Sequence, residues 1–128
     1  MTFFEDIDYK IIKNSMGDIY KIGDYVKFPD YLKGEFYFSE VMPRTIKTWR
    51  KHKKLNCIIG VAFGSVLLKL KSDLNTKEIS NRNLFLKKSK MIKINAGTWY
   101  SFENKSNSSC LLFVILNGKH DDNELERL

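Results

Sequence analysis

Short apolar segments recur along the chain at near-regular intervals, separated by turn residues. No window of a dozen residues carries the helical repeat of apolar positions between recognisable caps, so helices are not expected. Short segments rich in aliphatic and aromatic residues, bounded by Gly, Pro, Asn or Asp, are typical of β-strands. The segments that we predict as strands are Tyr9–Lys13, Ile19–Ile22, Glu35–Met42, Leu55–Phe63, Ser65–Lys71, Leu84–Leu86, Met91–Asn95 and Cys110–Leu116.

The residues between these segments predict how the strands are joined. Gly17 lies in a turn after the first segment, and Gly64 predicts a tight hairpin corner between two apolar runs. Ala96-Gly97 is a further turn, and the polar stretch Ser72–Arg82 predicts a loop. Many short strands with such connections indicate an all-β sandwich or barrel whose residues face alternately in and out.

Length and composition support one folded domain over residues 1–128. A chain of 128 residues, with 43% hydrophobic and 29% charged residues, can bury a single core and does not resemble a disordered segment. No apolar stretch approaches the roughly 20 residues of a membrane-spanning helix. The segment Met1–Asp6 lacks the pattern of a secretory signal, so we expect a cytoplasmic protein without membrane attachment.

The two cysteines, Cys57 and Cys110, each open an apolar run. Free cysteine in such a position usually serves as a small core residue. Neither belongs to a Cys-x-x-Cys pair, so we expect no disulfide and no cysteine metal site. A reducing cytoplasm fits this usage best.

The charge is positive and unevenly distributed. Lys and Arg number 22 against 15 Asp and Glu, a net charge of +7, which favours anionic partners. The stretch Arg44–Lys54 holds six permanent cations, one histidine, one tryptophan and no acid. A second cluster, Lys87–Lys90, is more typical of a solvated loop. The first cluster is therefore the better candidate for a functional site.

Three segments carry a resemblance to a known family. Gly34–Val41, continuing through Pro43 into Ile46–Lys54, is similar to a G-E-(I/F)-Y-F-S-E-V…I-K-x-W-x-x-H-K-(K/R) pattern. Ile94–Asn104 is similar to a P-P-G-x-W-H-x-F-x-N turn, with Asn95 for a proline and Tyr100 for the histidine. The tail from His120 to Arg127 is similar to an H-D-P-x-E-x-E-R ending. In this order, the segments resemble short members of the cupin superfamily related to dTDP-4-dehydrorhamnose 3,5-epimerase.

The resemblance implies a cupin jelly-roll β-barrel that acts on a nucleotide-linked 4-keto-6-deoxy sugar in surface-polysaccharide synthesis, as a homodimer. Metal-binding cupins present several histidines and an acid at positions that here hold Arg50, His52, Asn56 or Cys57, and Tyr100. Because a guanidinium stays charged and does not ligate a divalent metal, we expect a barrel without metal or other cofactor. Aromatic segments Tyr25–Phe28 and Phe36–Phe38 supply candidate dimer contacts.

The implied chemistry is proton transfer beside the C4 ketone of the sugar. The family's catalytic histidine aligns with Arg50, and His52 follows two residues later on the same strand face. The family's aspartate partner comes from a longer C-terminal portion, so no carboxylate partner is expected for His52. We assign His52 as the base, with Tyr100 or Tyr37 as the acid opposite. A neighbouring cation would keep the imidazole neutral.

The remaining candidate residues bind substrate. Cations from Arg44, Lys47 and Arg50 would lie near the phosphates or the C4 oxygen. Glu35 and Glu40 lie on opposite faces of their strand, so one of them lines the pocket. Other candidates have equally ordinary structural readings, since the aromatic rings also suit a core and the histidine also suits a turn cap; they are Trp49, Trp99 and His120.

Three classes of function remain open at this point. The first is an isomerase, either 3,5-epimerase-like or a 3,4-ketoisomerase, whose R-G-x-H-A-H-K-like segment matches His52-Lys53 only at its end. The second is a non-catalytic cupin that binds a sugar nucleotide. The third, a nucleic-acid binder using the Arg44–Lys54 stretch, is the weakest, because no nucleic-acid recognition motif is present.

Overall fold

In the computed structural model, the described residues (3–22, 34–72, 81–119, 121 and 123–127) form β-strands joined by turns, which confirms the all-β prediction. The strands are β1 (Phe4–Asp8), β2 (Lys10–Ile12), β3 (Ile19–Lys21), β4 (Glu35–Val41), β5 (Thr45–His52), β6 (Cys57–Phe63), β7 (Val66–Ser72), β8 (Asn81–Leu86), β9 (Lys90–Ile94), β10 (Thr98–Asn104), β11 (Cys110–Leu116) and β12 (Leu125–Arg127).

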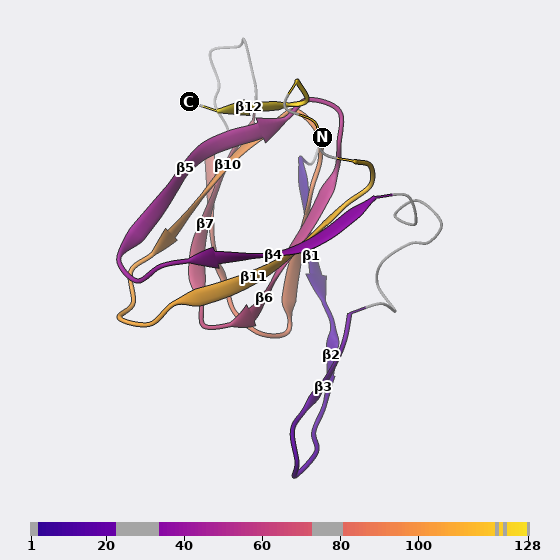
Figure 1. Cartoon of the computed structure of the whole chain (residues 1–128), viewed down its shortest axis with the longest axis vertical. Helices are drawn as coiled ribbons and strands as arrows, with labels where there is room; N and C mark the ends of the chain where they lie inside the picture. The colour runs from indigo at the N-terminus through magenta and orange to yellow at the C-terminus, as the bar shows by residue number, and fades with distance from the viewer. Residues whose placement is uncertain (1–2, 23–33, 73–80, 120, 122, 128) are drawn as a thin grey trace.

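The strands build a jelly-roll sandwich of two antiparallel sheets. The first sheet has the order β1-β9-β6-β11-β4, and the second has the order β12-β5-β10-β7-β8. A separate hairpin of β2 and β3 projects from the body of the sandwich (Figure 1). β12, near the C-terminus, lies along one edge of the second sheet next to β5 (Figure 1).

The main core lies between the two sheets. Alternate residues of β7 point inward, and Val66, Leu68 and Leu70 are almost completely buried. Full burial of one such side chain stabilises the fold by about 1.5–3 kcal/mol. The inward residues of the first sheet that join this core are Val41, Cys57, Ile59, Val61, Ile92, Ile94, Cys110, Leu112, Val114 and Leu116.

A smaller core covers the outer face of the first sheet. It contains Tyr9, Ile58, Met91, Phe113 and Ile115, and residues of the β2–β3 hairpin pack against it. β11 therefore has apolar residues on both faces, which explains why Cys110–Leu116 is a continuous apolar run. Gly60 is required here, because a Cβ atom would lie 2.1 Å from the Phe113 ring.

Gly64 forms a corner between sheets, and the predicted hairpin is wrong. β6 pairs with β9 and β11 in the first sheet, whereas β7 pairs with β8 and β10 in the second. Gly64 has a φ of +80°, and a Cβ there would lie 3.0 Å from the Ser109 carbonyl oxygen. The glycine thus lets the chain cross from one sheet to the other beside Ser109.

The hydrophobic pattern does not identify every strand. Phe4–Asp8, Thr45–His52, Thr98–Asn104 and Leu125–Arg127 are strands that it does not predict. In β5 the reason is that Arg50 and His52 face inward, where a core strand would carry apolar side chains. The two ends of the predicted loop Ser72–Arg82 belong to β7 and β8, and residues 73–80 lie outside the described residues.

Both cysteines are free and fully buried, as predicted. Burial raises the pKa of Cys57 to about 12 and that of Cys110 to about 11, so both thiols are protonated at neutral pH. Among the described residues, no helix has the length and apolar character needed to cross a bilayer.

Candidate functional site

A polar pocket of about 260 Å³ opens between the two sheets, at the end of the barrel that β12 covers. Its walls come from four strands, and the residues that line it are Glu35, Tyr37, Arg50, His52, Tyr100, Leu125 and Arg127. Arg50 and His52 both face it, as expected from the two-residue repeat of a strand.

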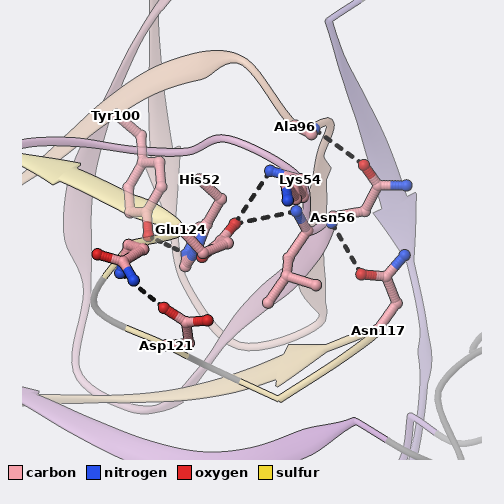
Figure 2. A network of polar contacts seen from close by, with 10 residues as sticks. His52, Lys54, Asn56, Ala96, Tyr100, Asn117, Asp121 and Glu124 are labelled. Carbon is pink, nitrogen blue, oxygen red and sulfur yellow. Dashed lines mark hydrogen bonds and ion pairs between the residues drawn. The ribbon is translucent and has the colours of Figure 1, made fainter.

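The centre of this site is a chain of three side chains. His52 Nδ1 lies 2.8 Å from Glu124 Oε2, and His52 Nε2 lies 2.9 Å from the Tyr100 hydroxyl (Figure 2). The three come from β5, β10 and the turn before β12, and each is less than a tenth exposed. Hydrogen bonds inside such a dry site are stronger than in water, so the three groups have well-defined positions.

Glu124 belongs to this candidate site although the sequence did not predict it there. No carboxylate partner was expected for His52, yet the chain places one 72 residues away, in its C-terminal segment. Glu124 Oε1 also accepts hydrogen bonds from the backbone N–H groups of Lys54 and Leu55. The available signal was the E-x-E-R ending, which carries part of the resemblance and begins with Glu124.

The hydrogen bonds determine the charge of Glu124. Burial opposes its ionisation, but the hydrogen bonds from His52, Leu55 and Lys54 outweigh burial and lower the pKa below its ordinary value of 4.5. The carboxylate is therefore ionised at neutral pH, and His52 Nδ1 is the donor in the bond between them.

A second network holds the chain segment that follows His52. The His52 carbonyl accepts a hydrogen bond from Gly97 N–H, and Asn56 Oδ1 accepts one from Ala96 N–H. Asn117 Oδ1 accepts from Asn56 N–H, which ties β11 to the same corner (Figure 2). The turn between β9 and β10 therefore bonds to residue 52 and to residue 56, one on each side of residues 53–55. These bonds hold the backbone at His52 in place.

The two pocket tyrosines differ in their surroundings. Tyr100 is buried, and burial raises the pKa of its phenol well above 10, although the Arg50 charge acts in the opposite direction. Tyr37 lies on β4, on the facing sheet, and burial together with Cys57 and Glu35 raises its pKa more moderately. Both phenols therefore carry their protons at neutral pH.

Two arginines that line the pocket are neighbours across two paired strands. Arg127 is the cross-strand partner of Arg50 between β12 and β5, and Tyr100 is the partner of Arg50 on its other side. Like charges opposite one another destabilise a strand pair by up to about 1 kcal/mol. An anion that bridged the guanidiniums of Arg50 and Arg127 would remove this repulsion.

The structure does not bring all the predicted cations into this pocket. Arg44 lies at the opposite end of β5, where its guanidinium donates to Asn107 Oδ1 at 2.7 and 3.0 Å. Its φ is +52°, so it occupies the turn between β4 and β5 and does not line the pocket. The cations of the basic stretch therefore do not form one cluster. Consecutive strand residues point to opposite faces, and the two ends of the strand contact different parts of the protein.

Lys47 and Trp49 also lie outside the pocket lining. Lys47 donates to Ser39 Oγ at 2.7 Å, and burial together with the Arg50 charge lowers its pKa. Trp49 is half-buried on β5, and it is Lys51 that lies over a tryptophan ring, that of Trp99, at 5.0 Å. His120 lies outside the described residues, as does the predicted contact segment 25–28.

The described residues do not supply the ligands that a metal ion needs. Among the described residues, no three His, Cys, Asp or Glu side chains form a group that could hold a metal ion. A second hollow, of about 380 Å³, lies beside β7 and the loop after β10, and its acidic group, Glu103, is paired with Lys69 at 3.1 Å. That hollow contains no pair of groups suited to acid–base chemistry.

No family model matches the chain, and no curated protein matches it in sequence. Solved structures are similar in fold. A dTDP sugar isomerase from Desulfovibrio desulfuricans G20 is 21% identical with a TM-score of 0.87, over 98% of this chain and 83% of that one. QdtA, a sugar 3,4-ketoisomerase from Thermoanaerobacterium thermosaccharolyticum in complex with TDP, is 19% identical with a TM-score of 0.74, over 98% and 88%.

A third similar structure is RmlC, the dTDP-6-deoxy-D-glucose-3,5-epimerase of Legionella pneumophila Philadelphia 1, in complex with dTDP-4-keto-L-rhamnose. It is 12% identical with a TM-score of 0.80, over all of this chain and 73% of that one. The chain thus has a cupin jelly-roll fold, which these structures share over 98–100% of its length.

Proposed function

We propose that this protein is an isomerase that moves protons beside the C4 ketone of a nucleotide-linked 4-keto-6-deoxy sugar, with 3,5-epimerase-like chemistry. The observation that carries the proposal is the ionised Glu124–His52 pair bonded to Tyr100 inside a pocket that also holds arginine. Removing a proton beside a ketone needs a positioned base and a cation for the enolate oxygen. Both are present within one cavity.

The positions of the two tyrosines favour epimerase-like chemistry. Inversion at a carbon needs one group to take a proton and another to return one from the opposite side. Tyr100, coupled to His52, lies on the second sheet, and Tyr37 lies on β4 of the first sheet. These two proton carriers approach the pocket from facing sheets, whereas a 3,4-ketoisomerase needs only one carrier between adjacent carbons.

The cations of the pocket suit an anionic substrate. Arg50 and Arg127 lie in register on neighbouring strands, with Glu35 as the half-buried acid on the opposite wall. Guanidinium groups bind phosphate oxygens through paired hydrogen bonds. Structures with the same fold were solved with TDP and with dTDP-linked keto-sugars, which supports a nucleotide-linked ligand here.

Solvent exchange tests the function. The protein is incubated with dTDP-4-keto-6-deoxyglucose in heavy water, and the sugar is analysed by NMR and mass spectrometry. Deuterium at C3 and C5 with inverted configuration is the expected result. A 3-keto product with deuterium at C4 identifies the ketoisomerase alternative, and binding without exchange identifies a non-catalytic sugar-nucleotide-binding cupin; either result contradicts the epimerase proposal.

The proposal extends to a cytoplasmic homodimer working in surface-polysaccharide synthesis, such as capsule or lipopolysaccharide. β4 is an edge strand, and Phe36 and Phe38 are 54% and 59% exposed on it, with ring centroids 5.4 Å apart. Exposed aromatic pairs on an unpaired strand edge favour contact with another chain. Light scattering should give twice the 15.0 kDa chain mass, and Phe38→Ser should shift the protein toward monomer; a monomeric wild-type protein contradicts the dimer.

A further inference from the structure

Both nitrogens of the His52 ring are already hydrogen-bonded within the protein. Glu124 is ionised and can only accept, so the proton of neutral His52 lies on Nδ1. Nε2 is then an acceptor, and the Tyr100 hydroxyl 2.9 Å away is its donor. The Tyr100 proton therefore points toward His52, and the remaining lone pairs of the phenol oxygen point elsewhere.

This geometry affects which atom can reach a substrate carbon. A catalytic base must lie within hydrogen-bond distance of the proton that it removes. The lone pair of His52 Nε2 is directed at Tyr100, and the side chain is 4% exposed. Direct attack by His52 would require the bond to Tyr100 to break first. The phenol oxygen needs no such rearrangement.

We propose that the Tyr100 oxygen is the atom that takes the proton from the carbon beside the ketone, while His52 takes the Tyr100 proton in the same step. This inference rests on the proposed function and changes the roles within the site. The carbon–hydrogen bond breaks, and its electron pair becomes the enolate. A new O–H bond forms on Tyr100, its original O–H bond breaks, and Nε2 gains the proton. Glu124 then faces an imidazolium. Reversal of the step returns a proton to the same face of the carbon, whereas inversion takes its proton from Tyr37 on the facing sheet, which regains a proton from solvent.

The surrounding charges are consistent with such a relay. The groups that act on Tyr100 come from four other parts of the chain: Cys57 on β6, Tyr37 on β4, Arg50 on β5 and Glu124 before β12. Burial makes a free tyrosinate costly at neutral pH, so a concerted transfer to His52 avoids forming one. Arg50, the cross-strand neighbour of Tyr100, supplies the positive charge for the enolate.

The first test needs no substrate. The chain contains only two histidines, so the ¹⁵N resonances of His52 are identified by comparison with a His52→Gln variant. The expected spectrum at pH 7 to 8 has a protonated Nδ1 and an unprotonated Nε2, and Tyr100→Phe should shift the Nε2 signal. A protonated Nε2 would overturn the relay whatever the substrate of the protein is.

The second test measures deuterium exchange into dTDP-4-keto-6-deoxyglucose from pH 6 to 10. Tyr100→Phe should reduce exchange by about 10²–10⁴-fold at every pH, because the accepting oxygen is gone. His52→Gln should lose a similar factor at pH 7, but its residual rate should rise about tenfold per pH unit as tyrosinate forms. These profiles separate the relay from a purely structural role of Tyr100.

A matched control removes a buried hydroxyl elsewhere. Tyr9 lies in the outer core, and its hydroxyl has no hydrogen-bond partner there, so Tyr9→Phe should leave exchange within twofold. If Tyr100→Phe keeps exchange within threefold while His52→Gln is inactive at all pH values, His52 contacts the substrate directly and the relay is wrong. If the wild-type protein itself gives no exchange, the proposed function fails, and the resonance test alone decides the hydrogen-bond arrangement.

Discussion

An arginine lies at or next to each end of β5, and the two ends have different environments. At one end, Arg44 and Thr45 enter the strand from an exposed turn, and the Arg44 guanidinium bonds to the side chain of Asn107. At the other end, about 23 Å away for a strand of this length, Arg50 and His52 lie between β10 and β12. Within the described ranges, only the second end has a paired strand on both sides.

This cover supplies the other residues of the proposed site. β12 contributes Leu125 and Arg127 to the pocket, and the turn before it contributes Glu124. A carboxylate placed against a buried imidazole acts strongly because little water screens it. At the Arg44 end the hydrogen bonds join Arg44 to the neutral amide of Asn107, and the Thr45 hydroxyl to the Pro43 carbonyl. These bonds hold the turn and include no acid–base pair. Within one strand, the His52 end therefore carries the groups of the proposed site, and the Arg44 end carries structural hydrogen bonds.

The largest effect is expected from removing the charge behind His52. Glu124→Gln keeps the size of the side chain but leaves the imidazolium without its anion, so exchange should fall by about 10²–10⁴-fold. The control is Glu126→Gln, since Glu126 is 42% exposed and pairs with Lys51 and Lys53. Solvent exchange into the keto-sugar measures both variants. A Glu124→Gln protein within threefold of wild type would contradict a catalytic contribution from this end of β5.

The two arginines of the stretch should differ in their effect on substrate affinity. Arg50→Gln removes a pocket cation and should weaken binding of a dTDP-sugar by about 10–100-fold, as for the loss of one charged hydrogen bond. Arg44→Gln, at the other end, should leave the dissociation constant within twofold. Titration calorimetry compares them at one salt concentration. Equal losses in both variants would mean that the ligand spans the whole strand.

Substitutions at the Arg44 end should affect the stability of the fold. Asn104 is fully buried, and its amide donates to the carbonyls of Val41 and Ser108 at 3.0 and 2.8 Å. Asn104→Ala leaves these carbonyls unpaired and should lower the free energy of unfolding by about 1–3 kcal/mol. Urea denaturation measures the loss, with exposed Asn107→Ala as the control. At temperatures below its melting transition, the Asn104→Ala protein should keep its exchange activity. Loss of that activity would show that the Arg44 end contributes to the proposed site.

The smallest expected effect is the pH dependence of stability. Because the folded-state pKa of Glu124 is lowered, its ionised form stabilises the fold above the unfolded pKa, near 4.5. That contribution disappears as the pH falls through the folded-state pKa. The stability difference between wild type and Glu124→Gln should therefore shrink between about pH 5 and pH 2 in thermal melts. A difference that stays constant over this range would show that Glu124 is not ionised in the fold.

Part of the site was readable from the sequence. The period-two repeat placed Arg50 and His52 on one face, and the same reasoning separated Glu35 from Glu40. Tyr37 and Tyr100 were candidates because they occur in the segments that carry the resemblance. Such inferences succeed because they depend on neighbours within one strand, or on aligned segments, where the backbone alone sets the direction of each side chain.

The assembly of the site was not readable in this way. Glu124 meets His52 across 72 residues, and Arg44 turns away toward Asn107 across 63. The hairpin expected at Gly64 is a crossing between sheets, because the partners of β6 and β7 are distant strands. These outcomes depend on which strands pair.

The sequence by itself determined an all-β chain, its turns, its buried cysteines and the face shared by Arg50 and His52, since alternation and local backbone preferences act over a few residues. Only the tertiary structure decided that β12 pairs with the end of β5 that carries Arg50 and His52, and not with the Arg44 end. Hydrogen bonds between distant segments form when the whole sandwich packs, and the burial that gives Glu124, His52 and Tyr100 their chemistry exists only after that packing.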